Sequence, residues 1–132
     1  RIDNSFWAAI ALGIFVTAFR DAIRARRVWR GVQVGAWSGF ISGLLACTAA
    51  LTLIVFGMAL LTADPLNVAE WATRGADERA PSMAAYFAFE TLAGAVLHLT
   101  VLGPVMGAVL GAVAGISARI SATISDRVAA AR

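Results

Sequence analysis

The sequence predicts an all-α integral membrane protein with about three transmembrane helices. Of its 132 residues, 60% are hydrophobic and 14% are charged, and the mean hydropathy is +0.78. This composition leaves too little polar surface for a soluble globule of this size. Two apolar runs also carry glycine at every fourth position, from Gly31 to Gly43 and from Gly103 to Gly115.

The glycine repeats predict helix packing of the small-xxx-small kind. Four-residue spacing brings each set near one side of a helix, where a second backbone can approach closely in lipid because no side chains intervene. The two sets are Gly31, Gly35, Gly39 and Gly43, and Gly103, Gly107, Gly111 and Gly115. We call them the first and second glycine ladders, and we expect them to pack against each other.

The first helix is expected over about residues 4–30. Asn4 and Ser5 can cap its start. Its apolar part, Phe6 to Phe19, covers roughly 21 Å, which is short against a hydrocarbon core of about 30 Å. A re-entrant or interfacial placement of this helix therefore stays open.

The end of this first helix is strongly basic. Five arginines accompany a single aspartate, Asp21. They are Arg20, Arg24, Arg26, Arg27 and Arg30. Positive charge beside an apolar span is retained on the cytoplasmic side, where it suits anionic lipid headgroups or an acidic partner. Although the net charge is +3, nucleic acid is not an expected partner, because the arginines cluster next to apolar spans.

A second helix is expected over about residues 32–63, followed by an external loop over residues 64–82. The apolar run is longer than one bilayer crossing requires. Asp64 and Pro65 predict a helix stop and the start of a short helix that reaches about Arg74 and lies at the membrane interface. Acidic residues outnumber basic ones in this loop, which indicates the side opposite the arginines.

A third helix is expected over about residues 83–125. Its apolar part exceeds one crossing, and Pro104 predicts a kink. A helical hairpin that turns at Gly103 and Pro104 stays open as an alternative, although it would leave backbone groups unpaired in lipid. Arg119 and Arg127 in the tail indicate a cytoplasmic C-terminus, which places the N-terminus outside.

Glu90 and His98 are the ionisable residues within this third apolar run, and they are candidates for contact with a partner or ligand. In a regular helix, His98 would lie about 220° from Gly103 and thus point away from the second glycine ladder. One interpretation is a neutral histidine bonded to Glu90 or to a backbone carbonyl. A second is contact with a neighbouring subunit. A third is axial ligation of a tetrapyrrole such as haem or chlorophyll.

The inventory of reactive side chains does not predict an enzyme or a metal site. The chain has one histidine and one cysteine, Cys47, so neither a hydrolytic triad nor a convergent ligand set is expected. Two function classes remain. The first is a non-catalytic subunit that packs on and stabilises a larger respiratory, photosynthetic, transport or secretory membrane complex. The alternative is a small transporter, channel or proton-conducting component that acts as an oligomer.

The expected location is a bacterial cytoplasmic membrane. All eleven basic residues are arginine, and the chain is rich in alanine and glycine, which is typical of a GC-rich coding genome. The expected partners are other membrane protein subunits and anionic lipids.

Overall fold

The computed structural model describes residues 4–74 and 80–131, with side chains from residue 8 onward. The predicted caps Asn4 and Ser5 therefore lie outside the described side chains. The described part is all-helical, as the sequence predicted. Its elements are α1 (Asn4–Ala25), α2 (Val28–Phe56), α3 (Met58–Ala63), α4 (Pro65–Arg74), α5 (Met83–Leu97), the π-helical segment η1 (His98–Leu102) and α6 (Gly103–Ala130).

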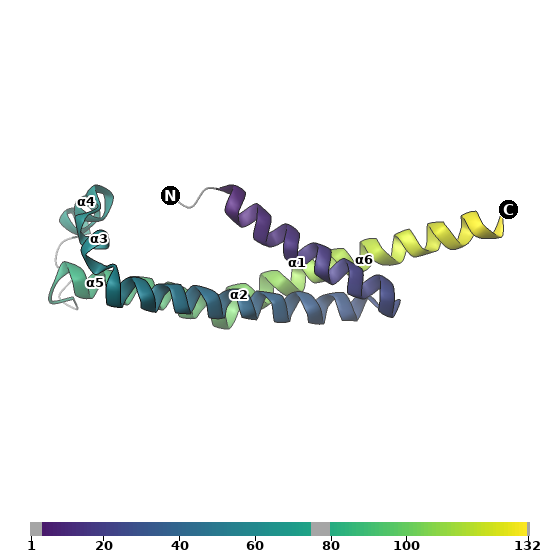
Figure 1. The fold of residues 1–132 in the computed structure, drawn as a ribbon, viewed down its shortest axis with the longest axis horizontal. Coiled ribbons are helices and arrows are strands. Elements are labelled where there is room, and N and C mark those ends of the chain that lie inside the picture. The colour runs from purple at the N-terminus through teal and green to yellow at the C-terminus, as the bar shows by residue number, and fades with distance from the viewer. Residues whose placement is uncertain (1–3, 75–79, 132) are drawn as a thin grey trace.

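The molecule is built on a long antiparallel pair of helices. α2 runs alongside the continuous helix formed by α5, η1 and α6, while α1 crosses α6 and diverges from the pair toward its own N-terminus (Figure 1). By length and apolar composition, the helices Val28–Phe56 and Met83–Ala130 could each cross a membrane. α6 continues past the start of α2, and α3 and α4 fold together at the other end of the pair (Figure 1).

The first connection is a tight turn at Arg26 and Arg27. Arg26 has a positive φ of 51°, a conformation that arginine seldom adopts, and Arg27 is extended. The sequence predicted this break at Gly31, but α2 already starts at Val28. Gly31 is buried inside α2, because its bare face lies against the backbone of α6.

The second apolar run is divided at Gly57, where the sequence predicted one helix as far as residue 63. Gly57 ends α2 by donating its backbone N–H to the Leu53 carbonyl at 2.8 Å. The predicted stop at Asp64 and Pro65 is present, since the Leu66 N–H donates to Asp64 Oδ1 at 2.8 Å and α4 starts at Pro65. These two breaks turn the chain across the end of the α2–α5 pair.

The third apolar run forms one helix, not the hairpin that the sequence left open. The predicted irregularity at Pro104 takes the form of a π turn in the five residues of η1, where the Gly103 N–H donates to the His98 carbonyl. Proline has no N–H, and its ring crowds the carbonyl four residues earlier, which here belongs to Thr100. A wider turn before Pro104 relieves this crowding.

Candidate functional site

The interior of the bundle is made almost entirely of small residues. The buried hydrophobic residues are Ala18, Ala22, Ala50, Tyr86, Phe87, Ala95, Ala114 and Ala118. Large apolar side chains instead lie outside, and Phe56, Leu60 and Phe89 are 84%, 74% and 70% exposed. This arrangement is the reverse of a water-soluble core, in which Leu, Ile and Phe are the residues most often buried.

The two glycine ladders lie face to face in α2 and α6. A Cβ on Gly31 would lie 2.5 Å from the Gly111 carbonyl oxygen, and a Cβ on Gly107 would lie 3.2 Å from the Gly39 Cα. A Cβ on Gly39 would also overlap the Gly103 carbonyl. The obstructing atoms belong to the backbone, so they cannot move aside as a flexible side chain would. Even alanine is therefore too large at these positions.

The close contact continues beyond the second glycine ladder into η1. A Cβ on Gly43 would meet the Leu99 Cα, and would lie 2.9 Å from the Leu99 nitrogen. Further along, Ala50 of α2 and Ala95 of α5 are buried at 6% and 8% exposure. The contact surface of the long pair is thus glycine at one half and a mixture of glycine, alanine and leucine backbone at the other.

The π turn changes the direction in which His98 points. One extra residue in the turn sets His98 back by about 100°, from about 220° to about 320° relative to Gly103, which is beside the ladder instead of opposite it. The structure agrees with this rotation, because His98 lines a groove together with Ser42 and Ala46 of α2. The sequence-based prediction that His98 points away from α2 is therefore corrected.

α1 joins the long pair at the point where it crosses α6. Ala18 and Ala22 on α1 are fully or almost fully buried, as are Ala114 and Ala118 on α6. Toward the N-terminus the contact opens, and nothing lies within 4 Å of a Cβ placed on Gly13. α1 is therefore attached mainly through its C-terminal half.

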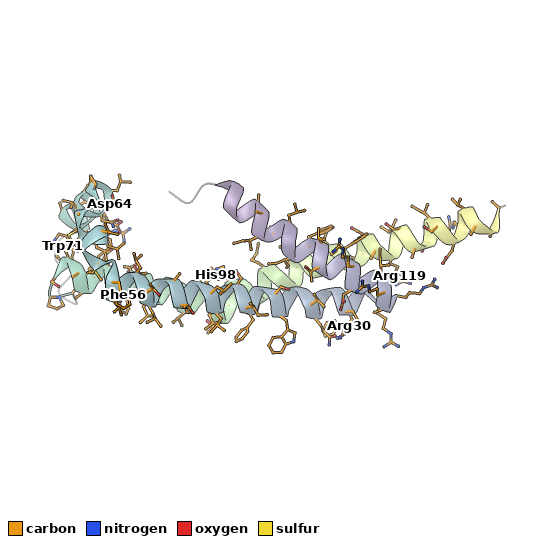
Figure 2. The ribbon with its side chains drawn as sticks, in the orientation of Figure 1. Arg30, Phe56, Asp64, Trp71, His98 and Arg119 are labelled. Atoms are coloured by element: carbon orange, nitrogen blue, oxygen red, sulfur yellow. The ribbon has the colours of Figure 1, made fainter. Side chains whose placement is uncertain are left out.

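Positive charges gather at the end of the bundle where α1 meets α2, which we call the basic end. All five arginines of the predicted headgroup or partner site are exposed: Arg20, Arg24, Arg26, Arg27 and Arg30. Arg30 Nη2 lies 3.4 Å from Asp21 Oδ2 and so links α2 to α1. Arg119 on α6 lies at this same end, whereas Asp64 and Trp71 lie at the opposite one (Figure 2).

A polar network joins α4 to α5 at the opposite end of the bundle, where Asp64 and Glu70 lie and which we call the acidic end. The Tyr86 hydroxyl donates to Glu70 Oε1 at 3.2 Å and accepts from Arg74 Nη1 at 3.1 Å. Arg74 Nε lies 3.5 Å from Glu70 Oε1, and the Trp71 ring packs on Tyr86 with centroids 5.7 Å apart. Tyr86 is buried, so its hydroxyl needs these partners.

The same network favours the cationic form of Arg74. The hydrogen bond that Arg74 donates to the Tyr86 hydroxyl, followed by the electrostatic interactions with Tyr86, Glu70 and Glu90, raises the pKa of the Arg74 guanidinium. Glu90 itself is exposed and is not among the residues that line the groove beside His98. The two candidate contact residues Glu90 and His98 thus lie in different surroundings.

The α4 helix is amphipathic, with its apolar side turned outward. Glu70 and Trp71 are half-buried against the bundle, while Leu66 and Val68 are 69% and 46% exposed. Asn67 faces inward and donates from Nδ2 to the Leu61 carbonyl at 2.8 Å. The polar side chains on the inner side of α4 therefore have partners within the protein, whereas the apolar side chains on its outer side remain exposed.

The structure adds no metal site among the residues that it describes. Within residues 4–74 and 80–131, no three His, Cys, Asp or Glu side chains come together in a way that could hold a metal ion. Comparisons of the chain with protein-family models, curated proteins and solved structures found no match. The packing surfaces themselves are therefore the basis for a functional assignment.

Proposed function

We propose that this chain is a non-catalytic integral membrane subunit that packs on and stabilises a larger membrane protein complex. The observation that carries this proposal is that small residues lie inside the bundle, whereas large apolar side chains lie on its outside. In the most apolar stretches of the two long helices, 17% and 28% of residues are buried, whereas the core helix of a soluble protein would be mostly buried. Lipid tails or neighbouring helices can cover such a surface, but water cannot.

The proposed orientation has three spans, with the N-terminus external and the C-terminus in the cytoplasm. The long pair supplies two spans, and α1 supplies the third with 22 residues, about 33 Å of helix. The basic end lies at the cytoplasmic side of a bacterial inner membrane, since positive charges are retained there. The acidic end then lies outside, with α4 resting its apolar side on the membrane surface.

Close packing of the glycine ladders favours a structural subunit over a transporter or channel. Backbone contact between α2 and α6 leaves no room for a pore between them. Within the described spans, the candidates for a proton or ion path are Glu90 and His98, and they lie in different surroundings. A conducting path would need further groups from other copies of the chain.

Purification from native membranes tests the proposal. A tagged chain extracted in mild detergent is expected to migrate with other membrane proteins in one defined complex. Leu44→Trp on α2 and Val109→Trp on α6 serve as a matched pair, because both positions are 52% exposed, and loss of partners in one variant identifies the contact face. Migration as a homo-oligomer without other proteins would instead favour the transporter, and migration as a monomer would contradict both.

A further inference from the structure

An apolar groove lies between α2 and α5, midway along the long pair. Its volume is about 550 Å³, within the range of about 300–1,000 Å³ that is common for small-molecule sites. It is lined by Ile10, Ser42, Leu45, Ala46, Ala49, Ala50, Leu53, Thr91, Gly94, Ala95 and His98. Figure 2 shows His98 near the middle of the molecule, away from both the basic and the acidic ends.

Two hydroxyl groups in the groove differ from nearby threonine hydroxyls on the same long helices. Thr48 and Thr100 each donate to the carbonyl one turn earlier, at 3.0 and 2.8 Å, so their hydrogen-bonding capacity is used within the helix. Ser42 and Thr91 take part in no such bond among the described residues. Their hydroxyls are therefore available to a ligand in the groove, which His98 borders as a third polar residue.

Several of the residues that line the groove are small. Nothing lies within 4 Å of a Cβ placed on Gly94 of α5, and Ala95 of α5 and Ala46 and Ala49 of α2 also line the groove. A planar ring can lie against such a surface and gain dispersion contacts over its whole face. Small residues at helix contacts are common, but here Gly94 faces open space, so helix packing does not explain it.

We propose that this groove binds the ring of a lipid-soluble quinone. A quinone is neutral and planar, its two carbonyl oxygens accept hydrogen bonds of the kind that Ser42 and Thr91 can donate, and its apolar tail suits the outer wall at Leu45 and Leu53. A haem fits less well, because its propionates need cationic partners and no arginine lines the groove. The site is independent of which complex the chain joins, and so goes beyond the proposed function.

Competition labelling tests the proposal in the purified full-length chain. A photoreactive azidoquinone in lipid nanodiscs is expected to label residues 42–53 and 91–98, and decylubiquinone is expected to prevent this labelling with a saturable dependence. 1-Decanol, which has the chain without the ring, is expected not to compete. Equal competition by 1-decanol would show an acyl-chain groove and overturn the proposal, as would absence of saturable labelling or labelling elsewhere.

Two glycines provide a matched pair of variants. Gly94 and Gly13 both have open space at the Cβ position, but only Gly94 lines the groove. Gly94→Leu is expected to abolish labelling with unchanged helicity and thermal unfolding, while Gly13→Leu leaves labelling intact. Ser42→Ala and Thr91→Val are each expected to weaken decylubiquinone binding about three- to tenfold. Unchanged binding in Gly94→Leu, or in both hydroxyl variants, would overturn the proposal.

Discussion

Gly35 and Gly107 face each other so closely that a Cβ on either would overlap the carbonyl oxygen of the other. The contact is reciprocal and joins backbone to backbone across the long pair. Because lipid tails are as apolar as leucine, helices in a membrane are held together by such dense contact and not by the hydrophobic effect. The ladder contact is thus the main attachment between α2 and α6.

Enlarging Gly35 is expected to weaken the long pair. Gly35→Leu must separate two backbones, so the free energy of unfolding should fall by about 1–3 kcal/mol, measured by denaturation in mixed detergent micelles. Gly13→Leu is the control, since nothing lies within 4 Å of that Cβ position. Equal stability of the two variants would mean that the ladders do not hold the helices together.

The π turn in η1 leads to a prediction about deletions. Removing Thr100 together with Pro104→Ala is expected to leave a regular α-helix in which Leu99 still faces Gly43, because the π turn already offsets the helix by one residue. The double change should be more stable than the deletion alone by up to about 3 kcal/mol, since Pro104 would otherwise crowd the Leu99 carbonyl.

Deletion of Val109 in the same Pro104→Ala background is the control for this experiment. It lies within α6, so its removal rotates Gly107 relative to Gly111 by about 100° and divides the second ladder. Unfolding measurements should find this variant far less stable than the Thr100 deletion. If the Thr100 deletion lowers stability as much as the Val109 deletion, the π turn does more than set the rotation of α5 relative to α6.

Tyr86→Phe is expected to loosen α4 from the bundle. The substitution removes the bonds to Glu70 and Arg74 but keeps the ring contacts with Trp71 and Phe87. Loss of these bonds should lower the free energy of local opening by about 1 kcal/mol, seen as faster amide exchange in residues 65–74. Thr73→Val, which removes a hydroxyl bonded only within α4, should exchange like the unaltered chain.

The same network should not respond to pH through Arg74. The pKa of this guanidinium is raised in the folded chain, so its contribution is fully present below the ordinary arginine pKa and is lost only above the raised value. Both lie far above neutrality. Amide exchange in α4, corrected for the intrinsic effect of pH, should therefore remain constant across the neutral range. If α4 opens more readily at some pH within the neutral range, a group other than Arg74 is responsible for that pH dependence.

The proposed orientation predicts different labelling of the two ends in intact cells. In a chain with Cys47→Ala, Arg24→Cys at the basic end should be protected from an impermeant thiol reagent, whereas Pro81→Cys near the acidic end should react. Both positions are exposed, so protection reports sidedness and not burial. Reaction at residue 24 alone would reverse the orientation.

Local patterns in the sequence predicted the helical class, the stop at Asp64 and Pro65 and the glycines that share a face. Such features depend on residues within one or two turns of each other. The sequence indicated a disturbance at Pro104 but did not predict that a π turn would accommodate it. That π turn sets the direction in which His98 points. The bond between Tyr86 and Glu70 joins residues 16 positions apart, and no periodic signal indicates how α4 folds back onto α5.

The overhang of α6 has a mechanical consequence. α2 begins at Val28, whose carbonyl lies 2.8 Å from a Cβ position on Gly115, so residues 116–130 continue for about 22 Å without support from α2. The stretch acts as a lever arm that is held at its base by the ladder and by α1, which packs near Ala118. A change of about 10° in the tilt of α6 would move its C-terminal tip by about 4 Å. A partner bound at that tip would therefore be displaced by small movements of the helix pair.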